Sequence, residues 1–255
     1  MNRPMNNSIE NFCEALTAAD KVLVLTGAGI STLSGIPDFR GATGCYQNKW
    51  HGMEVEEILS LPCFKKHPEY FYEWAQTFVY AVGDYTPNIV HKVLARWEKE
   101  NIIHGVYTQN IDILHQHAGS RRLYELHGSP AHHHCMQCGE YFDYDFVAPL
   151  VHAGTLPRCS QCGGVIKPDI VFYGENLNRE LLEQAFNDFA SADLALVLGS
   201  SLTVNPAAVL PQYTLRSGGK LAIVNMQPTN LDRFASWKFD DLRLTFEELA
   251  RLTSL

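Results

Sequence analysis

Short runs rich in apolar and β-branched residues recur along the chain, and longer amphipathic stretches separate them. The clearest runs span residues 21–26, 105–108, 122–126, 194–198 and 220–224. Such runs are typical of strands that are buried on both faces of a parallel sheet. Helical periodicity occupies several of the intervening stretches, for example residues 179–190. The alternation of strand and helix predicts an α/β fold with a doubly wound, Rossmann-like parallel sheet.

Two stretches interrupt this alternation. Residues 37–87 are rich in aromatic side chains and predict a helical insertion, and residues 129–167 contain two pairs of cysteines. We therefore predict a large Rossmann-like domain built from residues 1–36, 88–128 and 168–255. The insertions 37–87 and 129–167 are expected to form a smaller second domain.

The paired cysteines have the spacing of a metal site. Cys135 and Cys138 form one Cys-x-x-Cys knuckle, Cys159 and Cys162 form another, and twenty residues separate them. This spacing is typical of a zinc ribbon, in which four thiolates surround one structural ion. A redox dithiol or two disulfides could use the same residues, but the glycines directly behind each knuckle favour zinc. The histidines at 132–134 could compete for metal, although we favour a polar strand at the ribbon's edge.

Composition narrows the classes of function. The 255-residue chain carries a formal net charge of −8 at pH 7, which argues against a general affinity for nucleic acid or for anionic membranes. Its hydrophobic content of 46% is ordinary for a globular enzyme. Residues 1–7 are polar and lack the apolar core of a signal peptide, and no apolar run reaches membrane-spanning length. We expect a cytoplasmic protein without nucleic-acid or membrane partners.

A glycine-rich loop, residues 27–31, follows the first apolar run. Small residues there allow backbone N–H groups to approach a pyrophosphate. The loop departs from the dehydrogenase fingerprint, because Thr32 occupies the place of the third glycine and no acidic residue ends a second strand about twenty positions later. Asp38 and Arg40, shortly after the loop, could bracket a nucleotide or form a surface ion pair.

Taken together, these motifs resemble the successive signatures of the sirtuins, which are NAD-dependent protein lysine deacylases. The resemblance extends from about residue 21 to residue 225, and the length is similar to that of the short bacterial members. Tyr173 is a mild departure, since many members have phenylalanine at this place. The matching segments are residues 27–31, 35–40, 108–112, 125–128, the two cysteine knuckles, 167–175 and 199–201.

The resemblance implies a role for each matching residue. His127 corresponds to the general base, which takes a proton from a ribose hydroxyl, and Asn110 to the residue that orients the ribose and a water. One NAD and one structural zinc ion are the implied cofactors. Residues 171–175 match the substrate-binding segment, with Val171, Phe172, Gly174 and Glu175 as the expected contacts. The implied NAD contacts are Gly27, Ala28, Gly29, Ser31, Ile36, Asp38, Phe39, Arg40, Gln109, Asn110, Asp112, Gly199, Ser200, Ser201, Asn225 and Asp240.

The helical insertion bears on the acyl group. Sirtuins that prefer succinyl or malonyl groups carry Tyr-x-x-Arg here, and the arginine pairs with the acyl carboxylate. No arginine occurs from residue 41 to residue 92, and Ala75 stands three residues after Tyr72. An uncharged acyl group is therefore expected, with Phe39, Tyr72 and Trp74 as candidates for the pocket lining.

The resemblance predicts an NAD-dependent protein lysine deacetylase that acts on acyl-lysine proteins or peptides. It transfers the acetyl group to ADP-ribose and releases nicotinamide. Protein mono-ADP-ribosyl transfer, deacylation of longer neutral acyl groups and a non-catalytic NAD-binding scaffold remain as alternatives.

Overall fold

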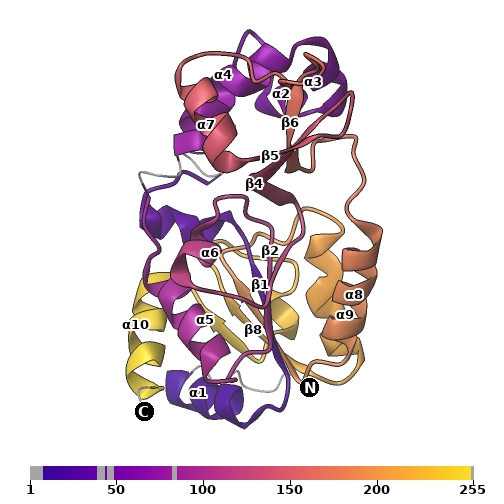
Figure 1. Cartoon of the computed structure of the whole chain (residues 1–255). Helices are drawn as coiled ribbons and strands as arrows, with labels where there is room; N and C mark the ends of the chain where they lie inside the picture. The colour runs from indigo at the N-terminus through magenta and orange to yellow at the C-terminus, as the bar shows by residue number, and fades with distance from the viewer. Residues whose placement is uncertain (1–7, 39–43, 45–48, 82–84, 254–255) are drawn as a thin grey trace.

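The computed structural model describes residues 8–38, 44, 49–81 and 85–253. Phe39 and Arg40, two of the expected nucleotide contacts, lie outside the described residues. The described chain forms two parts, one above the other in Figure 1. The lower part contains the long parallel sheet, and the upper part contains the insertion helices and a small sheet.

The large sheet has six parallel strands in the order β3-β2-β1-β7-β8-β9. All five apolar runs predicted as strands are confirmed. The sixth strand, at the edge beside β8, was not predicted; it is three residues long and has a lysine at its centre. The bounds are β1 (Val22–Thr26), β2 (Gly105–Thr108), β3 (Leu123–Glu125), β7 (Leu194–Leu198), β8 (Lys220–Val224) and β9 (Trp237–Phe239).

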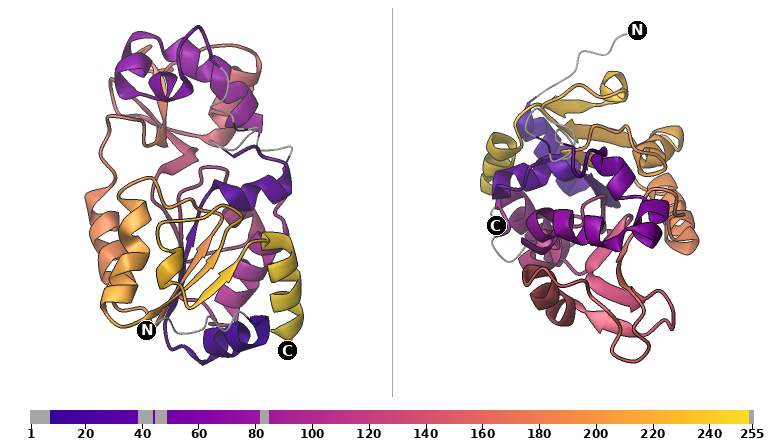
Figure 2. Two further views of the ribbon diagram at one scale, coloured as in Figure 1. Left: turned by 180° about the vertical axis from the view of Figure 1, so that it is seen from behind. Right: turned by 90° about the horizontal axis from the view of Figure 1, so that it is seen from above.

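Helices cover both faces of this sheet (Figures 1 and 2). Alternate residues of β1 divide between the two faces: Val22 and Val24 pack toward α1, α5 and α10, whereas Leu23 and Leu25 pack toward α8 and α9. This alternation explains why the strand is apolar at every position. The bounds are α1 (Ile9–Ala18), α5 (Ile89–Lys99), α6 (Leu114–Ala118), α8 (Arg179–Ala190), α9 (Leu210–Arg216), α10 (Leu242–Leu252) and the 3-10 helices η1 (Ala28–Ser34), η3 (Ala207–Val209) and η4 (Asp232–Phe234).

The upper part joins the two insertions around a core of its own. A three-stranded antiparallel sheet in the order β5-β4-β6 packs with four short helices. Phe64 and Phe71 from the helical insertion and Val147 and Ile166 from the cysteine-bearing insertion are fully or almost fully buried in this core. The bounds are α2 (Val55–Ile58), α3 (Leu61–Lys66), α4 (Pro68–Phe78), α7 (Tyr144–His152), β4 (Gly128–Cys135), β5 (Tyr141–Asp143) and β6 (Ile166–Ile170).

We propose that the two parts are separate domains with the boundaries given above. The division is supported by the side-chain clusters, because the core of the upper part draws on residues from both insertions. The expectation that residues 132–134 form a polar strand at the ribbon's edge is confirmed as to the strand and wrong as to the edge. The histidines at 132–134 lie on β4, which is the central strand of the small sheet rather than its edge. His133 is fully buried, and its Nε2 lies 2.7 Å from the hydroxyl of Tyr80.

Within the described part of the chain, no helix combines the length and apolar character that a membrane span requires.

Candidate active site and metal centre

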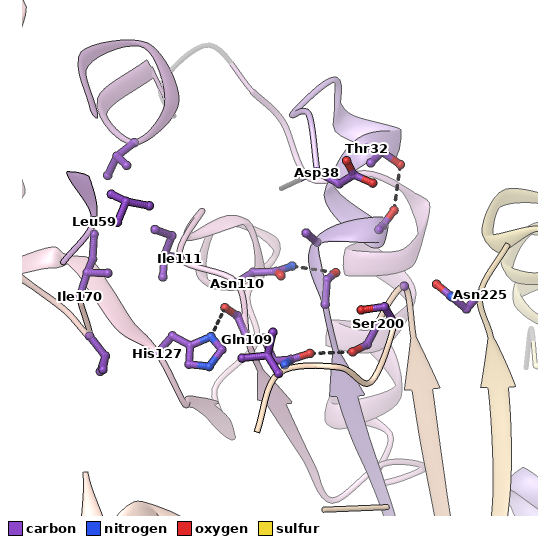
Figure 3. A pocket seen from close by; sticks show the side chains of 18 of the residues that line it. Thr32, Asp38, Leu59, Gln109, Asn110, Ile111, His127, Ile170, Ser200 and Asn225 are labelled. Atoms are coloured by element: carbon purple, nitrogen blue, oxygen red, sulfur yellow. Dashed lines mark hydrogen bonds between the residues drawn. The ribbon is translucent and has the colours of Figure 1, made fainter. Parts of the chain in front are cut away.

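A cavity opens at the carboxyl ends of the parallel strands, where β1 lies between β2 and β7 and the order of the strands reverses. Ligands of open α/β sheets bind at this kind of switch point. The cavity has a volume of about 510 Å³ and extends from the loops after β1, β7 and β8 to the segment after β6. Figure 3 shows side chains from both parts of the molecule around it.

Glycines let two loops meet backbone to backbone beneath the cavity. A Cβ atom on Gly27 would lie 2.7 Å from the carbonyl oxygen of Gly199, and one on Gly29 would lie 2.7 Å from the Gly199 Cα. Gly199 itself has φ +60° and faces Ile30 and Gly29 closely. Gly27 and Gly29 are therefore needed for the two loops to pack together, whether or not the loops also hold a ligand.

Asn110 offers an unused acceptor inside the site. Its backbone N–H donates to the Thr108 hydroxyl at 3.0 Å. Its side-chain amide donates to the Gly27 carbonyl at 3.2 Å and to the Ser31 hydroxyl at 3.1 Å. With both amide hydrogens engaged, Oδ1 is buried and has no hydrogen-bond partner in the described structure. A buried acceptor of this kind requires a donor from water or ligand, and a ribose hydroxyl meets that requirement.

His127 is held in one tautomer. Its Nδ1 lies 2.9 Å from the carbonyl oxygen of Gln109, which can only accept, so Nδ1 carries the hydrogen and Nε2 keeps its lone pair. The ring lines the cavity (Figure 3). Burial lowers the pKa of His127 below its usual value, and the hydrogen bond to Gln109 opposes that shift in part. The imidazole is therefore neutral at pH 7 and able to act as a base.

A second, smaller cavity adjoins the first, and both are lined by Ala28, Trp74, Val79, Asn110 and Ile111. On its polar side the Ser31 hydroxyl donates to Asp112 Oδ2, and the Leu114 N–H donates to Oδ1 at 3.0 Å. Burial raises the pKa of Asp112 above the ordinary range, and these hydrogen bonds oppose the shift. The carboxyl group thus forms a polar wall in a largely apolar niche.

The structure brings the expected site residues together. All of the described nucleotide and substrate contacts expected from the sequence line one cavity or the other. The larger is lined by Gly27, Ala28, Gly29, Asp38, Gln109, Asn110, His127, Val171, Phe172, Gly174, Glu175, Gly199, Ser200, Ser201, Asn225 and Asp240. The smaller is lined by Ala28, Ser31, Ile36, Asn110 and Asp112.

Comparison with known proteins identifies the family. The model of the Sir2 family matches residues 27–206. An NAD-dependent protein deacetylase of Thermotoga maritima is 41% identical over 232 residues, which is 91% of this chain and 92% of that protein. An NAD-dependent protein deacylase 2 of Archaeoglobus fulgidus is 38% identical over 98% of this chain and 99% of that protein. The chain belongs to the Sir2 family.

Solved Sir2 structures share the fold as well as the sequence. A Sir2 complex with a p53 peptide and NAD⁺ superimposes with a TM-score of 0.85 at 39% identity, covering 96% of this chain and 97% of that one. A Sir2 structure bound to a propionylated peptide gives a TM-score of 0.84 at 38% identity with the same coverage. The resemblance to the sirtuins seen in the sequence is therefore confirmed.

The metal centre of this Sir2 chain is built from the two cysteine knuckles. The four sulfur atoms all lie within 4.8 Å of one another, with Sγ–Sγ distances such as 3.5 Å between Cys135 and Cys162 and 3.6 Å between Cys138 and Cys159. Zn–S bonds of about 2.3 Å in a tetrahedron require S–S separations of about 3.8 Å, so the donor set fits zinc. None of the four cysteines lines either cavity, which makes the centre structural.

One end of the Sir2 cavity has an apolar lining that sequence reasoning largely missed. Leu59, Val79, Ile111 and Ile170 line it, together with the predicted Trp74. Ile111 and Ile170 could have been found, because they lie within the matching segments 108–112 and 167–175. Leu59 and Val79 carry no local signal, since they reach the cavity only through the packing of the insertion helices. Within the described residues, neither lysine nor arginine lines the cavity.

Tyr72, a candidate for the pocket lining, and Ala75, three residues after it, both face away from the cavity. The Tyr72 hydroxyl donates to the Ile166 carbonyl at 2.7 Å, and Ala75 is fully buried in the core of the upper part. Neither residue lines the cavity. The expectation that Tyr72 lines the pocket is therefore wrong in this structure, and Ala75 does not occupy a position from which a side chain would face the acyl group.

A buried chain of hydroxyls supports the Asn110 loop of this Sir2 protein from below. The Thr26 hydroxyl donates to Thr108 Oγ1 at 2.8 Å, and His115 Nε2 lies 3.1 Å from Thr26 Oγ1. Because Thr26 uses its hydrogen on Thr108, the hydrogen of the second contact must come from His115. Burial lowers the pKa of His115 to about 3, so its ring is neutral. His115 is itself almost fully buried.

Proposed function

We propose that this chain is an NAD-dependent protein lysine deacetylase, which transfers the acetyl group of acetyl-lysine to ADP-ribose with release of nicotinamide. The observation that carries the proposal is the pairing of two groups in one cavity: the free Nε2 of His127 and the unpartnered Oδ1 of Asn110. The deacetylase relatives and the NAD⁺ complex of a similar Sir2 support it.

When bound, NAD supplies the ribose that accepts the acetyl group and the nicotinamide that leaves. The chain's own residues bind, orient and move the proton. His127 Nε2 takes a proton from a ribose hydroxyl, while Gln109 keeps the ring in the required tautomer. Asn110 accepts a hydrogen bond from the sugar or from a water, and the glycine loops around Gly27 and Gly199 hold the phosphates.

The substrate peptide meets the backbone of residues 171–173. The Val171 N–H donates to the His127 carbonyl at 2.9 Å, and the Tyr173 N–H donates to the Leu59 carbonyl at 2.9 Å. The carbonyls of Phe172 and Tyr173 accept hydrogen bonds from Glu175 and Leu61. Among the described residues, nothing donates to the Val171 carbonyl. Val171 lines the cavity, so its carbonyl is the acceptor that we assign to the N–H of the acyl-lysine side chain.

Longer neutral acyl groups are a second candidate substrate class. The apolar lining around Ile111 and Ile170 favours longer neutral acyl groups over charged ones, because an alkyl chain gives up no hydrogen bonds to water when it enters the cavity. A similar Sir2 has been solved with a propionylated peptide.

The test is an assay of an acetyl-lysine peptide with NAD, in which mass spectrometry follows both the peptide and the nucleotide product. We expect the peptide to lose its acetyl group and an acetylated ADP-ribose to form. His127→Ala should lower the rate by about 10²–10⁴-fold. His152→Ala, on an exposed turn of α7, is the matched control and should leave the rate unchanged. ADP-ribose attached to the peptide or protein, without deacetylation, would instead identify a mono-ADP-ribosyltransferase.

We further propose that the enzyme works in the cytoplasm. The described cysteines are all free, and a four-thiolate metal centre suits a reducing compartment. Cell fractionation of the tagged chain tests this location, and recovery in an oxidising compartment would contradict it.

A further inference from the structure

A half-buried lysine lies under the segment that meets the substrate. The side chain of Lys167, at the start of β6, is 13% exposed. Its Nζ donates to the carbonyl of Ile170 at 2.8 Å and to that of Pro168 at 3.1 Å. The same nitrogen lies 2.9 Å from Glu175 Oε2 and 4.2 Å from the centre of the Phe172 ring. One ammonium group therefore touches both ends of the stretch from residue 170 to residue 175.

Glu175 holds the far end of the stretch from residue 170 to residue 175 through its own hydrogen bonds. Its Oε2 accepts the N–H of Phe172 at 2.8 Å, and its backbone N–H donates to the Phe172 carbonyl at 2.9 Å. The side chain of Glu175 is 26% exposed, so both charges are partly removed from water. A pair of this kind acquires much of its strength from hydrogen bonds to the groups around it.

These contacts fix the two peptide groups that flank Val171. Lys167 occupies the carbonyl of Ile170, and Glu175 occupies the N–H of Phe172. The N–H of Val171 is held by the His127 carbonyl. The Val171 carbonyl is then the group left to receive a hydrogen bond, and its direction is set by neighbours that cannot rotate independently.

We propose that Lys167 and Glu175 act as one positioning pair, which aims the Val171 carbonyl at the acyl-lysine substrate. The inference rests on the proposed deacetylase function. Neither residue takes part in the chemical step. The pair acts through the backbone, so it governs the affinity for the acyl-lysine peptide and leaves the handling of bound substrate by His127 largely intact.

The experiment compares Lys167→Met and Glu175→Gln with the unmodified protein, each at saturating NAD. For each single variant we expect the KM for the acetyl-lysine peptide to rise by about tenfold or more, and kcat to change by less than about threefold. The dissociation constant of the peptide, measured by fluorescence polarisation without NAD, should rise in parallel. Lys167→Arg keeps the charge and should recover part of the affinity.

A double-mutant cycle tests whether the two residues act together. The variant with both Lys167→Met and Glu175→Gln should raise KM by clearly less than the product of the single effects, because each single change already disables the pair. Arg179→Met is the matched control. It removes one cation from an ion pair with Glu183 on α8, where the two side chains are 90% and 58% exposed, and should leave the KM unchanged.

The outcomes separate this inference from the proposed function. Unmodified protein that does not deacetylate the peptide would defeat the proposed function and this inference with it. Active unmodified protein with unaltered peptide KM in Glu175→Gln would overturn the positioning pair alone. Equal losses in kcat and in peptide affinity, or multiplicative effects in the double variant, would also overturn it. If Lys167→Met does not fold, the near-isosteric Glu175→Gln and Lys167→Arg decide the question.

Discussion

Replacing the acetyl group of the substrate by succinyl should strongly slow the reaction. The end of the cavity that we assign to the acyl group is lined by apolar residues such as Leu59, Ile111 and Ile170. No lysine or arginine lines the cavity within the described residues. The carboxylates that line it, those of Asp38, Glu175, Asp240 and Asp241, would repel a further negative charge.

The loss of activity on succinyl-lysine can be estimated from the absence of a cation that would pair with the succinyl carboxylate. A carboxylate that enters a dry apolar site without a cation loses several kcal/mol of hydration. A penalty of about 3 kcal/mol in the transition state corresponds to roughly a hundredfold loss in kcat/KM. Propionyl adds only a methylene and should remain within about tenfold of acetyl.

A panel of acyl-lysine peptides measures kcat/KM for each group under one set of conditions. The gain-of-function variant is Leu59→Arg, because Leu59 lines the cavity and is only partly buried (Figure 3). It should raise succinyl activity relative to acetyl, whereas Leu59→Met should not. Arginine at Ala75 should instead destabilise the protein, since that position is fully buried in the core. Comparable kcat/KM for acetyl and succinyl in the unmodified protein would refute this reasoning about the pocket.

Three other predictions concern protons and metal. The kcat/KM should stay level from pH 8 to about 6.5 and decline only below it, because burial lowers the pKa of His127 beneath its usual value near 6.5; a midpoint above pH 7 would contradict this. Purified protein should hold one zinc, and Cys135→Ser should lower both the melting temperature and the activity; fully active zinc-free protein would exclude the metal centre. Burial lowers the pKa of His91 to about 4 and that of His115 to about 3, so below pH 6.5 the unfolded chain binds more protons than the folded one. Each should therefore cost about 2 kcal/mol of stability at pH 5 relative to pH 7, and denaturant unfolding of His91→Phe should lack one such contribution.

The parallel sheet could be predicted because its signal is local. A strand covered by helices on both faces must be apolar at successive positions, and β1, β7 and β8 show this directly in the sequence. The edge strand β9 pairs with β8 alone, and its sequence, Trp237–Phe239, has a lysine at its centre. Nothing in such a short mixed stretch separates it from a loop.

The residues of the candidate site likewise fall into those that a local motif reveals and those that only tertiary packing brings to the cavity. Residues that bind through loop geometry, such as Gly27 and Asn110, occur in motifs whose order along the chain can be recognised. Residues such as Leu59 and Val79 reach the cavity because two insertions pack against each other, and that packing leaves no pattern in either segment alone. His133 illustrates the same limit: its polar sequence context predicts a strand at the ribbon's edge, whereas the residue lies buried on the central strand β4, where its ring is in hydrogen-bond contact with the Tyr80 hydroxyl.

His127 joins the two halves of the site through its own backbone as well as its ring. Its Nδ1 is fixed by Gln109 from the large sheet, and its carbonyl receives the N–H of Val171 from the segment after β6. The base and the proposed substrate acceptor therefore belong to one hydrogen-bonded unit. His127, Val171 and the glycine loops all lie outside the two insertions, so a shift of the upper part relative to the large sheet would displace the lining residues Leu59 and Val79 more readily than it would separate His127 from Val171. Substitutions that loosen the packing of the upper part should accordingly disturb the apolar lining around Leu59 and Val79 before they disturb the alignment of His127 with the Val171 carbonyl.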